Sequence, residues 1–208
     1  MDYSVGNTKI GKDTLIINMG SAKDCPSKKL GLCKIAMCYA LKAEIQYPNV
    51  LPYRMRQENY WLSTDAIDIV EDISYVWKFN GSRDISLKFV RVNESGDFHS
   101  HKCLTKLIHI AKMLPNITFY TYTHRSDIVN NGTYKRLPSN LIINCSNFNR
   151  KGLNTFKAIV SVKVHSMKQI PKFRKEILKF ADFACVGDCS ICGYCKKQHG
   201  KVIGVPLH

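Results

Sequence analysis

The sequence predicts a single α/β domain with a mostly parallel sheet, in the form of a partial (β/α) barrel that carries a cysteine-rich C-terminal segment. Three observations predict it. Apolar segments of strand length alternate with amphipathic segments of helix length, the pattern of βαβ units. The segment Ile85–Val92 has apolar residues on both faces, as parallel strands covered by helices do. No linker rich in Gly, Pro or Ser divides the 208 residues.

Within this domain we expect residues 1–183 to form the α/β part, with a three-cysteine loop near its start. Residues 184–208 are expected to form a four-cysteine metal-binding segment packed on it. An open doubly wound sheet is the alternative architecture. In either fold, ligands gather at the C-terminal edge of the sheet, where strands end and loops begin.

The first half of the chain reads as strand, helix and a second, longer helix. Residues 14–19 form the first strand, which ends at Gly20 and leads into the first cysteine loop. Residues 38–45 form a helix that stops before Pro48. After Pro52 one long helix is predicted, because apolar residues recur three and four positions apart. They are Leu62, Ala66, Ile69, Val70, Ile73, Val76 and Trp77.

The second half continues the alternation. Asn80-Gly81 ends the long helix, and residues 85–92 form the second strand. An amphipathic helix follows, with its stripe from Leu104 to Leu114 and its end at Pro115. Three further strands are predicted at residues 117–123, 141–145 and 158–164, and a basic helix from Pro171 through Phe183.

The net charge of +15, from 31 basic and 16 acidic residues, favours polyanionic partners such as nucleic acid or a nucleotide. No apolar run approaches the length of a membrane span, and the N-terminus lacks the pattern of a secretion signal. We therefore expect a protein of the cytoplasm, or of the host cytoplasm if it is encoded by a virus, with no membrane partner.

The nine cysteines are an odd number, and cytoplasmic thiols stay reduced, so a disulfide framework is not expected. Cys103 lies in an amphipathic segment and Cys145 ends an apolar strand, so both are expected to be plain core residues. The other seven group at the two ends of the chain, and clustered cysteines in a reducing compartment indicate metal binding or redox chemistry.

The C-terminal group places four cysteines within eleven residues: Cys185, Cys189, Cys192 and Cys195. Structural zinc sites usually draw two ligands from each of two separated knuckles. Four closely spaced cysteines suit a cuboidal iron–sulfur cluster better, because each iron takes one thiolate. We therefore expect a [4Fe-4S] cluster here, with zinc and a metal-free segment as the alternatives.

The N-terminal group has three cysteines, Cys25, Cys33 and Cys38, with Tyr39 after the last. Three ligands leave one metal position open to water, a substrate or another residue, which is the mark of a reactive site. The alternatives are that these cysteines share metal with the C-terminal group, or that one is merely buried.

The turn Glu94-Ser95-Gly96-Asp97 follows a predicted strand and is a candidate cofactor-binding segment. Backbone can approach a ligand closely at Gly96. Asp97 is alternatively a helix N-cap. His99 and His101 come next and are candidate ligands or acid–base groups; the alternative is that they are exposed histidines near a helix start, which need no function.

Several short motifs, in order and spacing, resemble the phage and bacterial family called gene product 88. They are Cys25-Pro26, Cys38-Tyr39-Ala40, Ser95-Gly96-Asp97-Phe98 with Ser100, Pro115, the aromatic strand Phe119–Thr123, the terminal cysteines and Pro206-x-His208. The resemblance runs over most of the chain and implies a protein encoded by a virus or prophage, of poorly defined role.

A more distant likeness is to radical S-adenosylmethionine enzymes. These place three cysteines in the loop after their first strand, a Gly-Gly-Glu segment after their second, and often an auxiliary cluster near the C-terminus. The cysteine gaps here are seven and four residues where those enzymes have three and two, and Gly-Gly-Glu is absent. The likeness implies an open-iron cluster at the N-terminal cysteines, S-adenosylmethionine held near Glu94 to Asp97, and an auxiliary C-terminal cluster.

Three functions therefore compete. The first is an iron–sulfur enzyme of the radical S-adenosylmethionine type. The second is a non-catalytic iron–sulfur protein that carries electrons from a donor, senses redox state or binds nucleic acid. The third is a zinc-stabilised nucleic-acid module. The sequence contains no Gly-x4-Gly-Lys loop, dinucleotide fingerprint, His-Glu-x2-His helix or Gly-x-Ser-x-Gly elbow.

Overall fold

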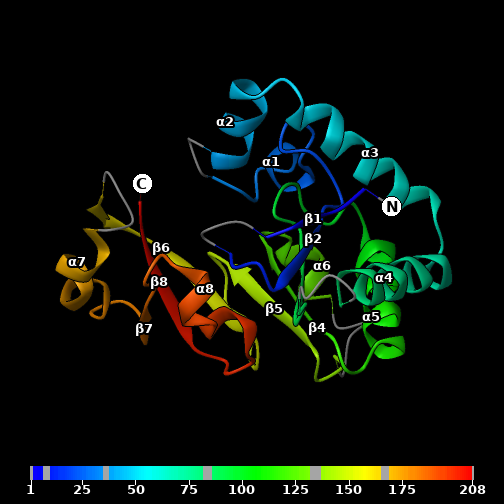
Figure 1. The fold of residues 1–208 in the computed structure, drawn as a ribbon. Coiled ribbons are helices and arrows are strands. Elements are labelled where there is room, and N and C mark those ends of the chain that lie inside the picture. The colour runs from blue at the N-terminus through cyan, green and yellow to red at the C-terminus, as the bar shows by residue number, and fades with distance from the viewer. Residues whose placement is uncertain are drawn as a thin grey trace.

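An open sheet forms the centre of the computed structural model (Figure 1). The structure describes residues 2–6, 10–34, 38–81, 86–131, 137–164 and 169–207, and within them the sheet has eight strands. In chain order the strands are β1 (Ser4–Val5), β2 (Thr14–Ile17), β3 (Phe89–Val92), β4 (Thr118–Thr123), β5 (Leu141–Ser146), β6 (Asn154–Lys163), β7 (Phe183–Ala184) and β8 (Val202–Leu207).

The helices lie mainly in the first half of the chain, between β2 and β4. They are α1 (Pro26–Lys29), α2 (Tyr39–Gln46), α3 (Val50–Ser63), α4 (Ala66–Gly81), α5 (His101–Met113), α6 (Ser126–Val129), α7 (Ile170–Ile177) and α8 (Cys189–Cys192), followed by the 3₁₀ turn η2 (Tyr194–Lys196). Among the residues described, no helix combines the length and apolar character that a bilayer span requires.

The strand order is β1-β2-β3-β4-β5-β6-β8-β7, and every neighbouring pair is parallel except the antiparallel pair β1 and β2. A consecutive order from β2 to β6 is the order of a partial barrel, whereas a doubly wound sheet reverses its order at a switch point. The sheet ends at β1 and β7 and does not close. The predicted α/β fold with a mostly parallel sheet is therefore confirmed, and the sheet is open.

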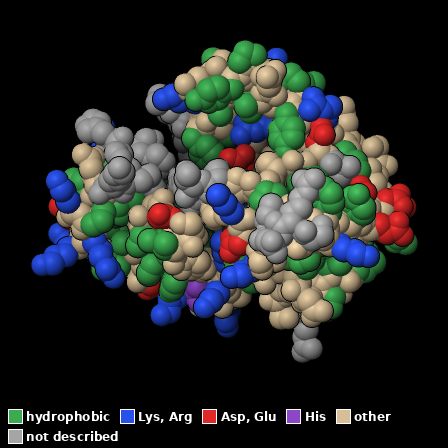
Figure 2. Space-filling view, in the orientation of Figure 1, with side chains coloured by type: hydrophobic (Ala, Val, Ile, Leu, Met, Phe, Trp, Pro, Cys, Tyr) green, Lys and Arg blue, Asp and Glu red, His purple; other side chains and the backbone are tan. Residues whose placement is uncertain are grey.

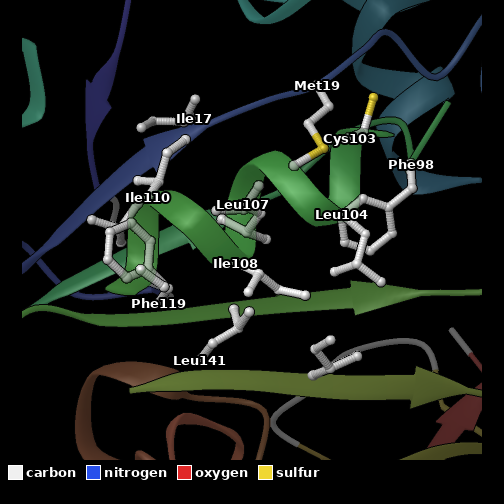
Figure 3. Close-up of a cluster of buried hydrophobic side chains, with 14 of the residues drawn as sticks. Ile17, Met19, Phe98, Cys103, Leu104, Leu107, Ile108, Ile110, Phe119 and Leu141 are labelled. Atoms are coloured by element: carbon white, nitrogen blue, oxygen red, sulfur yellow. The ribbon is translucent and has the colours of Figure 1, made fainter. Parts of the chain in front are cut away.

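The main hydrophobic core lies on one face of this sheet, under α4 and α5. Figure 3 shows Leu104, Leu107 and Ile108 of α5 packed over Phe119 of β4 and Leu141 of β5. Cys103 and Cys145 are 4% and 0% exposed within the same core, which confirms their predicted role. A smaller core under α7 contains Ile159, Val162, Ile170 and Ile177.

The opposite face, which we call the inner face, carries the residues that alternate with the core residues. Arg91 of β3, Tyr120 and Tyr122 of β4, and Asn144 of β5 lie on it, because successive side chains of a strand point to opposite faces. The turn η2 packs across β4 and β5 on this face. The C-terminal cysteine segment therefore covers part of the inner face.

The predicted long helix after Pro52 is wrong, because two helices, α3 and α4, occupy this stretch. The break falls at Thr64 and Asp65, where the Asp65 carboxylate accepts hydrogen bonds from the backbone N–H groups of Ile67 at 2.8 Å and Asp68 at 3.1 Å. This is an N-cap, which starts a new helix. Leu62 is 51% exposed, so it does not belong to the buried stripe that the periodicity indicated.

Other helix and strand boundaries also differ from those predicted. The basic helix ends at Ile177, and Phe183 belongs to β7. Strand β6 begins at Asn154, four residues before the predicted start, and β3 begins at Phe89, while Ile85 lies outside the described residues. Strand β8 was not predicted, although it lies between β6 and β7 and pairs with both. The C-terminal residues are thus part of the sheet itself.

Candidate metal centre

The four C-terminal cysteines line one narrow cavity at the inner face of the sheet. Cys185 follows β7, Cys189 and Cys192 are the first and last residues of α8, and Cys195 lies in η2. Tyr120 and Tyr122 line the same cavity from β4, and its lining as described includes none of the N-terminal cysteines. The four thiols thus gather at one place, and strand residues form the floor beneath them.

Local hydrogen bonds fold this segment around the thiols. Asp188 is the N-cap of α8, with its carboxylate accepting from the Ser190 N–H at 2.9 Å. Gly193 follows α8 with a left-handed φ of 60°, which turns the chain back so that Cys195 faces the same side. The short helix, the glycine and the 3₁₀ turn therefore place cysteines that are close in sequence near one another in space.

Two contacts tie the segment to the sheet. The Cys185 N–H donates to the carbonyl of Gly204 in β8 at 2.9 Å, and the Asn144 side chain of β5 donates to the carbonyl of Cys195 at 3.1 Å. Asn154 holds the following residues, because its side chain donates to the Lys197 carbonyl at 2.8 Å. The cysteine segment is therefore fixed at both ends to strands.

Burial controls the protonation of the Cys195 thiol. It raises the pKa of Cys195 to about 12, and the neighbouring thiols of the other three cysteines add to this rise. Burial also raises the pKa of Tyr122 well above its usual value, and Cys195 adds to it. Without a cation these groups stay protonated at neutral pH, and thiolates form only if a metal takes the place of the protons.

The donor set fits a thiophilic metal, since four thiols line the cavity beside Tyr120 and Tyr122, and its described lining adds the Asp188 carboxylate but no imidazole. Within the described ranges, however, no three His, Cys, Asp or Glu side chains converge as they would around a single ion. The cavity holds about 20 Å³, close to the room of one water molecule, so a cluster requires the segment to open around it.

The N-terminal cysteines occupy the loops that follow β2. Cys25 stands at the start of α1, Cys33 lies just beyond its end, and Cys38 precedes α2. Burial raises the pKa of Cys25 to about 11, and the charges of Asp97 and Cys33 raise it further. Cys33 is therefore near enough to Cys25 for the two thiols to interact electrostatically. Residues 35–37, just before Cys38, lie outside the described part of the chain.

The turn from Glu94 to Asp97 packs directly on the first cysteine loop. Gly96 has a φ of +72°, and a Cβ atom added there would lie 2.6 Å from the Gly20 carbonyl oxygen. The Ser95 N–H donates to the Asn18 side chain at 2.8 Å, and the Glu94 carboxylate accepts from Arg54 at 3.2 Å. The close approach predicted at Gly96 is therefore made to the protein's own backbone.

Asp97 ties three segments together. Its carboxylate accepts from the hydroxyls of Ser27 and Thr123, both at 2.6 Å, and from the backbone N–H groups of Phe98 and His124, both at 2.8 Å. It is not the N-cap of α5, because Ser100 occupies that position. The polar groups of this turn are thus used to join the ends of β2, β3 and β4.

The candidate histidines have separate surroundings. His99 Nε2 lies 2.8 Å from the Met19 carbonyl and 3.1 Å from the Glu58 carboxylate, beside an open cleft of about 540 Å³. The cleft is lined by Asp24, Pro26, Lys29, Leu30, Met55, Glu58, Asn59, His99 and Arg125. His101 contacts Asn131 at 3.1 Å, and His208 lies outside the described residues.

Sequence reasoning missed a buried ion pair that organises the first loop. Arg54 of α3 donates to Glu44 of α2 at 2.9 Å, and their side chains are 5% and 2% exposed. Glu44 also accepts from the backbone N–H groups of Ala22 and Lys23 at 2.7 and 2.9 Å. A Glu and an Arg on two amphipathic helices are common, so no local signal distinguishes this pair.

With this geometry in view, comparison with known proteins gives one result. A sequence model of the gene product 88 family matches residues 3–196, nearly the whole chain. No curated protein and no solved structure matches the chain. The likeness to radical S-adenosylmethionine enzymes finds no support in these comparisons.

Proposed function

We propose that this chain, which belongs to the gene product 88 family, is an iron–sulfur protein whose C-terminal cysteines hold a [4Fe-4S] cluster. The observation that carries the proposal is the cavity shared by Cys185, Cys189, Cys192 and Cys195. All four donors are thiols, the ligands on which such clusters are built. When bound, the cluster supplies one-electron redox chemistry.

The residues around these thiols have identifiable tasks under this proposal. Asn144 and the β8 backbone hold the segment at its two ends, while Gly193 turns it. Tyr120 and Tyr122 line the same cavity as the thiols. Hydrogen bonds and burial around a cluster tune its reduction potential, so these two side chains are its tuning residues.

The N-terminal cysteines form a second, incomplete set in the same proposal. Cys25 and Cys33 lie within electrostatic reach, and Cys38 follows at the start of α2. Three thiols leave one iron without a protein ligand, which gives the site a place for a small molecule. The polar groups of Ser95 and Asp97 are bound within the protein, so we assign the open position to the cysteines and not to that turn.

The decisive experiment is iron, sulfide and zinc analysis of protein purified without oxygen, together with a visible spectrum. We expect a brown protein with acid-labile sulfide and a broad absorption at about 400 nm. A colourless, air-stable protein with stoichiometric zinc and no sulfide would select the zinc site instead. Metal-free protein that retains its fold would refute both.

A second function, nucleic-acid binding, is favoured by the basic surface around α7. Figure 2 shows Lys and Arg side chains gathered on the side of α7 and the C-terminal segment, while acidic side chains gather on the opposite side of this view. Lys172, Arg174, Lys175 and Lys179 are all exposed there. Phosphate contacts of this kind make affinity fall steeply with salt. Absence of DNA and RNA binding would exclude this function, and binding that does not weaken with salt would show that the surface around α7 does not carry it.

A further inference from the structure

An open cleft of about 540 Å³ lies at the C-terminal edge of the sheet, beside the first cysteine loop. Its lining includes Asp24 after β2, His99 after β3 and Arg125 after β4, which are three neighbouring parallel strands. Helix α3 contributes Met55 and Glu58. Ligands of α/β proteins bind at this edge, and small-molecule sites have volumes of roughly 300 to 1,000 Å³. The cleft therefore has both the place and the room for a small molecule.

A histidine and a glutamate in the wall of the cleft form a hydrogen-bonded pair. His99 Nε2 lies 2.8 Å from the Met19 carbonyl oxygen and 3.1 Å from the Glu58 carboxylate. Both partners are acceptors, so Nε2 carries the proton and the lone pair of the neutral imidazole is at Nδ1. Nδ1 makes no hydrogen bond to the described residues and is not among their buried polar atoms without a partner, so solvent or a ligand reaches it.

The backbone at the end of β2 fixes the position of this pair. A Cβ atom added to Gly20 would lie 3.0 Å from His99 Nε2 and 3.5 Å from the carboxyl carbon of Glu58. The lack of a side chain at Gly20 therefore lets the backbone pack closely against both groups. The Ser21 N–H also donates to the Glu58 carboxylate, at 3.3 Å. The pair is thus held by three elements before any ligand arrives.

The charges that line the cleft are paired, except for Glu58. The Arg125 guanidinium is bound to Asp127 at 2.7 Å and to two backbone carbonyls. The Lys29 ammonium is bound to Asp24 at 2.9 Å. In the described part of the chain no Lys or Arg lies within salt-bridge distance of the Glu58 carboxylate, whose hydrogen-bonding partners are an imidazole and a backbone N–H. The cleft therefore offers a carboxylate charge and an imidazole lone pair side by side.

We propose that this cleft binds a small molecule that carries a primary ammonium group on an apolar body. The ammonium has several N–H donors and a positive charge, which match the Nδ1 acceptor of His99 and the carboxylate of Glu58. The apolar body has partners in Leu30 and Met55, which line the cleft and are 58% and 47% exposed. This inference goes beyond the metal site and does not require that a cluster is bound.

Isothermal titration calorimetry of the purified chain, with any metal it carries, tests the site at about pH 8, where an ordinary imidazole is neutral. The titrants are phenethylammonium and phenylpropionate at matched ionic strength. We expect saturable heat with the ammonium and none with the carboxylate. Glu58→Gln is expected to weaken binding about tenfold or more, because it removes a charge-assisted hydrogen bond. His99→Gln keeps an N–H for the Met19 carbonyl but removes the ring acceptor, and a few-fold loss is expected.

His109→Gln is the control for the histidine variant, because His109 is exposed on α5 and is not part of the cleft lining; its affinity is expected to equal that of the wild type. Should Glu58→Gln not fold, Leu30→Lys adds a repelling cation at an exposed position of the cleft and is expected to abolish binding. Leu62→Lys is its control, because Leu62 is 51% exposed and lies outside the lining.

The outcomes that overturn the proposal are specific. No saturable heat, or equal heat from phenylpropionate, excludes an ammonium site. Equal affinity of Leu30→Lys and the wild type places the ligand outside the cleft. If the protein is brown, a change in its visible spectrum on binding would place the amine on iron, and an unchanged spectrum is expected. Binding by protein that proves metal-free would leave this proposal standing while the iron–sulfur proposal falls.

Discussion

The two cysteine groups of this chain are organised in opposite ways. The C-terminal four are brought together by local structure, since a four-residue helix, a glycine turn and a 3₁₀ turn cover Cys189 to Cys195. The N-terminal three are spread over the loops between β2 and α2, and buried side chains from other elements hold these loops. Hydrogen bonds of the Glu44, Arg54 and Asp97 side chains hold them in place.

This difference separates a complete ligand set from an incomplete one. Four thiols on one short segment need little more than their own backbone to converge, which suits a cluster with every iron bound by protein. Loops held by distant residues can present fewer thiols in a fixed shape and leave a position free. The C-terminal group is therefore the better candidate for a structural or relay cluster, and the N-terminal group for a reactive one.

The largest expected effect comes from removing one thiol from each group. Cys192→Ser is expected to lose the whole C-terminal cluster, about half of the iron if both groups are loaded, because a cuboidal cluster with a missing ligand is labile. Cys33→Ser is expected to lose the other half. Iron and sulfide analysis of both oxygen-free variants checks this. Loss of all iron in either variant would mean that the seven cysteines share one centre.

Next in size is the loss of the carboxylate that joins the N-terminal loops. Asp97→Asn places an amide N–H₂ opposite hydroxyl and backbone donors, including those of Ser27 and His124. We expect the free energy of unfolding to fall by about 3 kcal/mol, as measured by chemical denaturation. Asp188→Asn, at the exposed cap of α8, is the control from the C-terminal group and is expected to change stability far less. Equal effects would contradict the contrast between the groups.

Glycine substitutions test the same contrast through the backbone. Gly96→Ala combines a φ of +72° with a contact of 2.6 Å to the Gly20 carbonyl oxygen, and we expect a loss of about 3 kcal/mol. Gly193→Ala has a φ of +60° with no heavy atom within 4 Å, so strain alone costs about 1 kcal/mol. Thermal unfolding of the two variants, both metal-free, decides whether the tight packing lies in the N-terminal loop as inferred.

The smallest effect is a pH dependence at His124, next to the Asp97 network. Burial lowers the pKa of His124 from 6.5, so the unfolded chain binds this proton more readily than the folded one. Its stabilisation is present above about pH 6.5 and is lost as the pH falls below it. His124→Asn is therefore expected to flatten the decline of the melting temperature between about pH 6.5 and 5. An unchanged profile would show that the pKa of His124 is the same in the folded and the unfolded chain.

Local pattern predicted much of the fold, because the strands around Leu15, Phe119 and Ile143 have strand length and buried apolar residues. The same reasoning failed at Asp65, since a cap within an apolar stripe stops one helix and starts another without altering the period. It also failed at β8, where Gly204 and Pro206 interrupt an apolar run. A strand inserted between two others owes its place to its partners and not to its composition.

By itself the sequence determined the α/β class, the core role of Cys103 and Cys145, and the closeness of the four C-terminal cysteines. These depend on spacing within a few turns of chain, where geometry follows from the backbone. Only the tertiary structure decided the rest. It set β8 between β6 and β7, joined Ser95 to Asn18 across 77 residues, and packed Arg91 against the rings of Tyr120 and Tyr122. The reason is physical: buried polar groups must find partners, and which partners are near depends on how distant segments pack.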